Sequence, residues 1–376
     1  MSIITNETRI FRRFDLHAFL HFLGRGLYSI FVPILVLKNG YSLTYAFLFL
    51  ISVFVVMLTT TVANTRLVRF KKIFYFNVLA TLAELGLIIF FSVNSPQPLV
   101  FIALFICEGL YYAFYYVAYR SIMIHNTSAA HVVTNMGNLA IAAQFASLLA
   151  PFVGALLLTA GKPFLLLTAA LFILVSLWPL VSIVNRPLDI DTHPKIAIKT
   201  VMRSLLAYGF LRALEINLFW IWAIYVYLDG LSLAFISLIP VSTAAATILV
   251  VSGLKRIIIK PFWWRLAVAV GALIIILVSV WRFFAGSFLT LTNFAASVGF
   301  LLALVPLETR LYSSFRGHDI YHAAGLMEIV AGIGALAVLL LAFTIGLKAA
   351  LLAPIILAPL MLFLAWKSGI ANDGGK

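Results

Sequence analysis

The sequence has 376 residues, of which 64% are hydrophobic and only 10% are charged, and its mean hydropathy is +1.12. Soluble domains carry about 25% charged residues, so this composition excludes a soluble globular protein and predicts an integral membrane protein. The net charge of +14 lies in short segments between apolar runs, which favours membrane orientation over nucleic-acid binding. Cys107 is the single cysteine, so no internal disulfide can form, and we interpret it as a small buried residue.

Apolar runs long enough to cross a bilayer, which takes about 20 residues, follow one another along the whole chain. Twelve membrane spans are predicted, at 16–37, 41–63, 73–93, 98–119, 132–159, 163–184, 204–228, 231–253, 262–284, 287–308, 320–346 and 349–366. The longest separator, 185–203, contains two prolines and five basic residues and has the profile of a cytoplasmic linker. The sequence therefore predicts an all-α protein with two pseudo-symmetric six-helix bundles, 1–184 and 204–376.

Positively charged residues are concentrated on one side of these spans. With the N-terminus inside, 20 Lys and Arg residues fall on the cytoplasmic side and 4 fall outside, while Arg25 and Arg212 lie within spans. Arg120 is counted as an inside charge and Arg282 as an outside charge. Because an excess of Lys and Arg marks cytoplasmic loops, we expect a multi-pass protein of a cell or inner membrane with both termini in the cytoplasm.

The two halves also resemble each other. The basic segment Lys255–Lys260 lies between spans 8 and 9, where the first half has the basic segment Thr60–Ile73 between spans 2 and 3. Such an echo agrees with a duplicated six-helix unit.

This layout resembles the major facilitator superfamily, whose loop motif after the second span reads Gly-x-x-x-Asp-Arg-x-Gly-Arg-Arg/Lys. Arg66 and Arg69 match the two arginines, and Lys71 is basic one residue late. Other residues stand where Gly, Asp and Gly are expected, namely Thr61, Thr65 and Val68. The acidic partner of the superfamily's conformational charge relay is therefore missing here.

A second match lies in span 5, where Ala150-Pro151-Phe-Val-Gly154 is similar to the Gly-Pro-x-x-Gly-Gly end of a motif of drug/proton antiporters. Small residues let helices approach closely, and Pro bends a helix. Gly154 and Pro151 are therefore suited to a helix that changes its packing during transport. Small residues and Pro are also common in membrane helices generally, so a purely structural reading stays open.

Ionisable residues inside spans are costly and usually face a cavity or a partner. In span 1, His17, His21 and Arg25 lie four residues apart and therefore share one helical face. Arg25 lies about 12 Å along the span by helix rise. These residues form either a hydrated, ligand-facing stripe or an interfacial set in which Arg25 extends to the cytoplasm.

Span 4 places Glu108 near its centre, with Tyr112 and Tyr116 on the same face. The resemblance implies that spans 1, 4, 7 and 10 line a central cavity, which puts Glu108 opposite Arg25. The two would form an ion pair gated by substrate or protons, or alternatively a static pair that holds the first bundle together.

Span 7 carries Arg212 and Glu215 three residues apart on one face, and span 10 offers Asn293 as an uncharged cavity donor. Arg212 and Glu215 either neutralise each other or form a site in which the Glu215 carboxyl group loads and releases protons. Glu308 and Arg310, at the cytoplasmic end of span 10, are interpreted as gate or loop charges.

Two further carboxylates, Glu84 and Glu328, lie on helices that the resemblance places away from the cavity wall. We expect Glu84 to be protonated or paired with a neighbouring helix, and a coupling role for it stays open. Glu328 is expected to meet the basic ends of span 8 or span 2.

The function implied is secondary active transport of a small organic solute by alternating access, proton-coupled and directed to efflux of an amphipathic compound. The expected partners are the solute, protons and the lipid bilayer, with no nucleic acid, and the chain is expected to work as a monomer. No cofactor, metal site or enzymatic motif is predicted, because phosphate loops, nucleophile elbows and metal-ligand spacings are missing. A lipid or lysolipid translocator of the same fold stays open, as does a non-transporting sensor or lipid-modifying enzyme.

Overall fold

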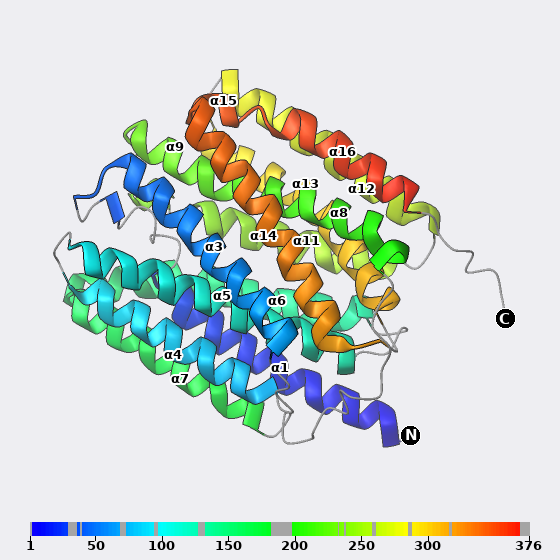
Figure 1. Ribbon diagram of the computed structural model, residues 1–376, viewed down its shortest axis with the longest axis horizontal. Helices are drawn as coiled ribbons and strands as arrows, with labels where there is room; N and C mark the ends of the chain where they lie inside the picture. The colour runs from blue at the N-terminus through cyan, green and yellow to red at the C-terminus, as the bar shows by residue number, and fades with distance from the viewer. Residues whose placement is uncertain are drawn as a thin grey trace.

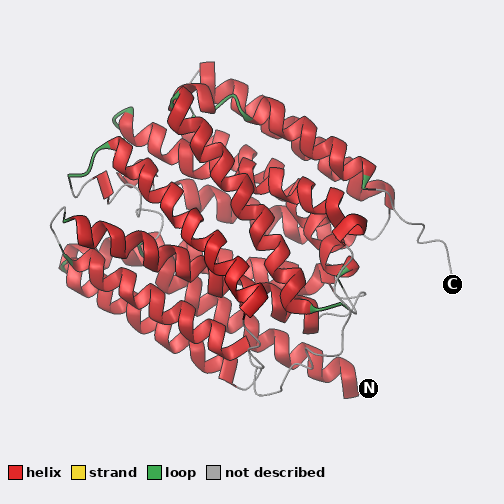
Figure 2. Cartoon of the chain, in the orientation of Figure 1, coloured by secondary structure: helices red, strands yellow, loops and turns green. Residues whose placement is uncertain are grey.

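The computed structural model describes residues 2–28, 36–37, 40–67, 73–93, 97–126, 132–181, 198–231, 233–236, 238–257, 261–284, 288–315 and 318–368. Every regular element within these ranges is a helix, as Figure 2 shows. The motif residues Arg69 and Lys71, and most of the predicted linker 185–203, lie outside the described residues.

The first half of the chain forms six long helices: α1 (Ser2–Gly26), α3 (Leu43–Leu67), α4 (Ile73–Ser92), α5 (Pro98–Asn126), α6 (Val132–Ala160) and α7 (Lys162–Val181). The second half forms α8 (Ile198–Glu215), η2 (Ile216–Ile221), α9 (Trp222–Leu228), α10 (Leu233–Ile236), α11 (Leu238–Ile257), α12 (Pro261–Phe284), α13 (Leu289–Ser314), α14 (Ile320–Ile345), α15 (Leu347–Ala350) and α16 (Pro354–Lys367). The element η2 is a π-helix that continues α8 directly into α9. Helix α1 begins and α16 ends on the same side of the bundle, right in Figure 1, which we call the termini side; the opposite side is the far side.

Ten helices within the described residues are long and apolar enough to cross a membrane, and Leu238–Leu254 is a shorter apolar helix. Within the described residues, one predicted span differs from the structure. The first span, predicted at 16–37, corresponds to a helix that already begins at Ser2 and ends at Gly26. A hydropathy criterion cannot detect the polar start of α1, although residues such as its arginines are good helix formers.

Helix packing repeats in the two halves. In the first half α1 contacts α6 and α7, α3 contacts α5, and α4 contacts α5 and α7. In the second half α8 contacts α14 and α16, α11 contacts α13, and α12 contacts α13 and α16. The same five pairings therefore occur in the same order, as a duplicated unit requires.

The two halves meet mainly through two helix pairs, α3 with α14 and α6 with α11 (Figure 1). The α3–α14 crossing is close because Gly325 of α14 has no side chain: a Cβ atom there would collide with the Cγ2 atom of Thr65. Thr65 therefore occupies a packing position between the halves, at the place where the loop motif has its aspartate.

Candidate functional site

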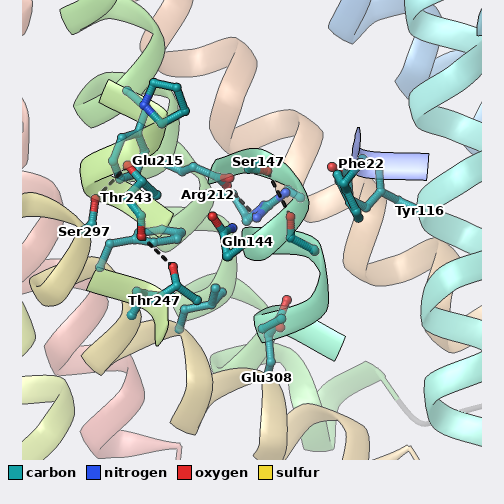
Figure 3. Close-up of a pocket in the computed structure, with 18 of the residues that line it drawn as sticks. Phe22, Tyr116, Gln144, Ser147, Arg212, Glu215, Thr243, Thr247, Ser297 and Glu308 are labelled. Atoms are coloured by element: carbon teal, nitrogen blue, oxygen red, sulfur yellow. Dashed lines mark hydrogen bonds and ion pairs between the residues drawn. The ribbon is translucent and has the colours of Figure 1, made fainter. Parts of the chain in front are cut away.

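A cavity of about 460 Å³ lies between the two halves (Figure 3). Helices α1, α3, α5 and α6 line it from the first half, and α8, η2, α9, α11, α13 and α14 line it from the second. Its walls differ in chemistry, with one aromatic wall, one wall rich in hydroxyl groups, and three arginines paired with glutamates.

The aromatic wall is centred on Tyr112 and Tyr116 of α5, both predicted as site residues. Their rings are stacked with centroids 5.6 Å apart. Tyr112 also packs near Phe54 of α3 and Trp220 of η2, with centroid distances of 6.1 Å and 6.4 Å. Rings from both halves thus present apolar faces, and the tyrosines add hydroxyl groups, to whatever enters the cavity.

The hydroxyl-rich wall, on α6, α11 and α13, was missed by the sequence analysis. Figure 3 shows its members, which are Gln144, Ser147, Thr243, Thr247 and Ser297. The Ser297 hydroxyl donates to Thr243 Oγ1 at 3.0 Å, which joins α13 to α11. Isolated Ser and Thr residues are common in membrane helices, where they bond to their own backbone, so their types alone give no signal.

Arg25 and Glu108 come together as the sequence predicts. The Arg25 Nη2 atom donates to Glu108 Oε1 at 2.5 Å, and Nη1 lies 3.4 Å from Oε2. The guanidinium carbon lies 3.9 Å from the ring centroid of Tyr111. Arg25 lines the cavity, whereas Glu108 lies behind it and is 1% exposed.

Glu84 is paired with a neighbouring helix, which is one of the two states expected for it, and its partner is the cavity-lining Arg25. Arg25 Nη1 donates to Glu84 Oε1 at 3.3 Å, and the Tyr28 hydroxyl donates to the same oxygen at 2.8 Å. Helix α4 itself does not line the cavity, but the Arg25 side chain is long enough to reach a carboxyl group on the neighbouring helix. Glu84, Glu108 and Arg25 therefore form one buried group.

His21 lies beside this group and does not line the cavity. Its Nε2 atom is 2.9 Å from the Tyr111 hydroxyl, and its ring is stacked on Tyr115 with centroids 4.2 Å apart. Its Nδ1 atom is 3.7 Å from Glu84 Oε2. His17 is directed to the backbone carbonyl of Ser176 at 2.8 Å, which is a structural contact between α1 and α7.

Arg212 and Glu215 form a second ion pair that lines the cavity, with Nη1 and Oε2 2.5 Å apart. Their side chains are 19% and 27% exposed, so this pair is the more accessible of the two predicted ones. The π-helix η2 begins at the next residue, and π-helical turns often occur at functional sites. Across the described residues, no three His, Cys, Asp or Glu side chains are arranged to hold a metal ion.

A third charged group joins the two halves, and the assignment of Arg120 to a loop is wrong. Predicted span 4 stops at residue 119, but α5 continues to Asn126 and buries Arg120, which is 2% exposed. Arg120 of the first half donates to four side chains of the second, at 3.0 Å to Glu308, at 2.9 Å to Tyr312, and also to Glu328 and Tyr208. We call these five residues the Arg120 network.

The prediction that Glu328 meets the basic end of span 8 or span 2 is also wrong. Its carboxylate accepts from Arg120 on α5, the fourth span, and not from the ends of spans 8 or 2. Glu308, Glu328 and Arg120 all line the cavity, towards the termini side. Arg120 lies 12 residues after Glu108 on α5, which is about 18 Å along the helix.

Asn293 does not line the cavity, contrary to expectation. It is fully buried, and its Oδ1 atom accepts from Arg282. Arg282, counted as an outside charge at the end of predicted span 9, is 2% exposed; it donates to the Leu218 carbonyl at 2.7 Å and lies 4.4 Å above the Trp222 ring. In the π-helix, the Trp222 N–H donates to the carbonyls of Asn217 and Phe219.

Removing Arg120 and Arg282 from the charge count leaves 19 inside and 3 outside, since one charge leaves each total of 20 and 4. The direction of the bias is unchanged. The orientation of the termini stays a prediction.

The motif residues of α6 pack against the end of α1. A Cβ atom on Gly26 would lie 2.8 Å from the Cβ of Ala150, and one on Gly154 would lie 3.4 Å from the Leu27 carbonyl oxygen. Pro151 lies inside α6 between these two contacts. Arg66 lies in the last turn of α3, next to the ranges that the structure leaves undescribed.

No protein-family model matches the sequence, and no curated protein matches it. Solved structures match in fold. The human organic anion transporter MFSD10 is 17% identical with a TM-score of 0.63, covering 95% of this chain and 99% of that one. The E. coli fucose:proton symporter FucP is 14% identical with a TM-score of 0.67, covering 96% and 98%.

A third match is a bacterial homologue of the iron transporter ferroportin in an outward-facing state. It is 15% identical with a TM-score of 0.71, and the alignment covers 96% of this chain and 99% of that one. Likeness at this identity establishes the fold, and it confirms the predicted fold class. The chain is an all-α, multi-pass membrane protein with the fold of major facilitator superfamily transporters.

Proposed function

We propose that this protein is a secondary active transporter that moves a small amphipathic organic solute by alternating access, in exchange for protons and in the direction of efflux. It would work as a monomer with both termini in the cytoplasm. The observation that carries the proposal is the cavity between the two halves, since transporters built from internal repeats bind their substrate at the repeat interface.

The size and chemistry of the cavity support a small organic solute. Its volume of about 460 Å³ lies within the range of roughly 300–1,000 Å³ that is usual for small-molecule sites. Stacked aromatic rings on one wall and hydroxyl groups on the other suit a compound with one apolar and one polar face. The three similar structures carry different cargoes by name, so the solute class is argued from this cavity and not from them.

Alternating access requires contacts between the halves that break and re-form. The Arg120 network supplies such a contact on the termini side, and the pairs Arg25/Glu108 and Arg212/Glu215 supply ionisable groups in the middle of the bundle. The antiporter-like segment around Pro151 favours efflux through its resemblance to the drug/proton antiporter motif, and it packs on the end of the helix that carries Arg25.

The test is transport by purified full-length protein in liposomes with an imposed pH gradient. Flux of amphipathic organic cations, organic anions, neutral amphipaths and a fluorescent lysolipid is compared with protein-free liposomes. We expect gradient-driven flux of a small amphipath, and loss of its coupling to the pH gradient in Glu108→Gln.

Two outcomes would contradict the proposal. Translocation of the lysolipid alone would favour the lipid-translocator alternative. Coupling that is unchanged in Glu108→Gln would remove the predicted ion pair from the mechanism.

A further inference from the structure

The buried group around Arg25 holds two carboxyl groups but one guanidinium. Arg25, Glu84 and Glu108 are 5%, 0% and 1% exposed. Removing an ionised carboxylate from water without a counter-charge costs several kcal/mol. Two ionised carboxylates beside one arginine would leave one negative charge unbalanced, and a single proton on either carboxyl group removes it.

Apart from His21, which is a cation only when it is itself protonated, no other described residue is placed to balance this charge. Helix α1 brings His21 and Arg25 to Glu84, with Tyr28 just beyond its end, and α5 brings four titratable residues, which are Cys107, Glu108, Tyr111 and Tyr115. Helix α7 also packs on α4, but its only titratable residue is Lys162, at its first position. Besides Glu84, the only titratable residue of α4 itself is Tyr75.

The contacts distinguish the two carboxyl groups. Glu108 accepts the shortest hydrogen bond from Arg25, at 2.5 Å, and its second carboxylate oxygen lies 3.4 Å from the other guanidinium nitrogen. Glu84 accepts a longer hydrogen bond from Arg25, at 3.3 Å and on Oε1 alone. Its buried Oε2 has no hydrogen-bond partner among the described residues. The guanidinium therefore neutralises Glu108 more strongly, and Glu84 is the carboxyl group better placed to be neutral.

We propose that Glu84 holds an exchangeable proton on Oε2, and that loss of this proton makes the cavity favourable for an amphipathic organic cation. This inference rests on the proposed function and names the proton site and the solute class within it. Deprotonation leaves a carboxylate on Glu84 and delivers the proton to solvent. The nearest basic atom is Nδ1 of His21, 3.7 Å away, whose lone pair faces Glu84 when Nε2–H donates to the Tyr111 hydroxyl.

The sign of the coupling follows from the charges. With the proton on Glu84, the group of Arg25, Glu84 and Glu108 is neutral; without it, the group carries one negative charge. Arg25 lines the cavity, and the change is transmitted there through its guanidinium. A bound cation and the proton therefore disfavour each other, and by linkage the effect is reciprocal.

Other features of the cavity also favour a cation. Arg212 and Glu215 balance each other, whereas the Arg120 network has two carboxylates for one arginine, and the Glu308 side chain is 13% exposed and so is less costly to ionise than the fully buried Glu84. The stacked rings of Tyr112 and Tyr116, with the tilted ring of Trp220 beside them, present faces that attract cations. An anionic solute would instead bind together with the proton, which is the opposite coupling.

The proton itself is tested by infrared difference spectroscopy of the full-length protein in lipid, without any transport. We expect the wild type to show the carbonyl band of a protonated carboxyl group that disappears as the pH is raised. Glu84→Gln should abolish this band, and Glu215→Gln, at a carboxylate already paired with arginine, should leave it in place. Tyr28→Phe should shift the band to higher frequency, because Tyr28 donates to Glu84 and not to Glu108.

The infrared result overturns the proton site if the band survives in Glu84→Gln or does not respond to Tyr28→Phe. Tyr28→Phe keeps both carboxyl groups, so it decides the assignment even if Glu84→Gln folds poorly.

The solute class is tested with ethidium, an aromatic organic cation, by direct binding and by flux driven by a pH gradient. Wild-type affinity for ethidium is expected to rise with pH, and the affinity of Glu84→Gln is expected to be low and independent of pH. Gradient-driven flux that persists in Glu84→Gln overturns the inference while the proposed function stands. Conversely, the expected infrared bands without gradient-driven flux of any solute leave the proton site in place and contradict the proposed function.

Discussion

Arg282 is a cation buried near the far end of α12 with no carboxylate within ion-pair distance among the described residues. Its guanidinium is held by two neutral oxygens, the Leu218 carbonyl and Asn293 Oδ1, and by the face of Trp222. These contacts tie α12 to η2 and α13. Arg282 is therefore expected to be a structural residue that fixes the π-helix against its neighbours.

The prediction at this site concerns stability. Arg282→Ala would leave the Leu218 carbonyl and Asn293 Oδ1 without their donor, and each buried unsatisfied group costs about 1–3 kcal/mol. We expect a clearly lower unfolding temperature in detergent, measured by the thermal unfolding of purified protein. The matched control is Trp281→Ala, on the same helix but 49% exposed, which should change that temperature little. An equal decrease in unfolding temperature in both variants would show that the buried contacts of Arg282 contribute no more to stability than an exposed side chain of the same helix.

Residues in the middle of spans were predicted better than residues near their ends. Arg25 and Glu108 were paired correctly because both lie deep inside apolar runs, where a charge needs a partner. Arg120 was assigned to a loop because predicted span 4 stops at residue 119, and Arg282 was counted as an outside charge because it lies close to the outer end of predicted span 9. Their burial is a property of the packing between helices, which hydropathy along one helix does not contain. For the same reason the pairing of Glu84 with a neighbouring helix could be expected, but its partner, Arg25 of α1, could not be named.

Helix α12 and helix α13 meet at two glycines. A Cβ atom on Gly271 would lie 2.5 Å from the Gly299 carbonyl oxygen, and one on Gly299 would lie 3.0 Å from the Gly271 carbonyl oxygen. Both obstacles are backbone atoms, which cannot rotate away as a side chain could. Close approach of this kind is how membrane helices gain packing energy, since lipid supplies little hydrophobic drive between them.

Gly271→Ala is therefore expected to push α12 and α13 apart and to lower the unfolding temperature. The matched control is Gly253→Ala in α11, where an added Cβ atom meets nothing within 4 Å. Because Ala favours a helix over Gly by about 1 kcal/mol, the control should be neutral or slightly stabilising. Thermal unfolding of the two variants side by side measures the difference, and a destabilised Gly253→Ala would contradict the packing explanation.

At the scale of elements, the number and order of long apolar helices could be predicted, but two irregular features could not. The polar residues that open α1 give no hydropathy signal, so the first helix begins 14 residues before its predicted start, at Ser2 and not at 16. The π-helix η2 also has no sequence signal, since Ile216–Ile221 has an ordinary apolar composition. The π-helix is stabilised by contacts from neighbouring helices, such as the hydrogen bond from Arg282 of α12 to the Leu218 carbonyl.

The two halves are joined differently at the two sides of the molecule. On the far side, Phe47 of α3 and Phe343 of α14 make an edge-to-face contact with centroids 6.1 Å apart. On the termini side, Phe76 and Tyr321 stack at 5.7 Å, and the Arg120 network adds charged contacts between the halves. A charged contact depends on exact partners, so it is a more switchable element than apolar packing.

Arg120→Gln tests whether this network holds the halves together on the termini side. The substitution removes the positive charge by which α5 of the first half holds Glu308 and Glu328, both of the second half, so the attraction between the halves on this side is lost. Because about 1.4 kcal/mol is a tenfold change in an equilibrium, even a fraction of the roughly 3–5 kcal/mol typical of a broken buried pair should be measurable. We expect a membrane-impermeant maleimide, applied from the termini side, to label the cavity at least about ten times faster.

The label is placed by Ser147→Cys, a cavity position on α6, in a chain whose single cysteine is changed by Cys107→Ser. The matched control is Arg212→Gln, which removes another cavity arginine whose partner Glu215 lies on the same helix. That pair does not join the halves, so its loss should leave the labelling rate unchanged. Equal acceleration in both variants would mean that general loosening of the cavity, and not release of the Arg120 network, admits the reagent. Unchanged labelling in Arg120→Gln would mean that apolar packing alone keeps the halves together on this side.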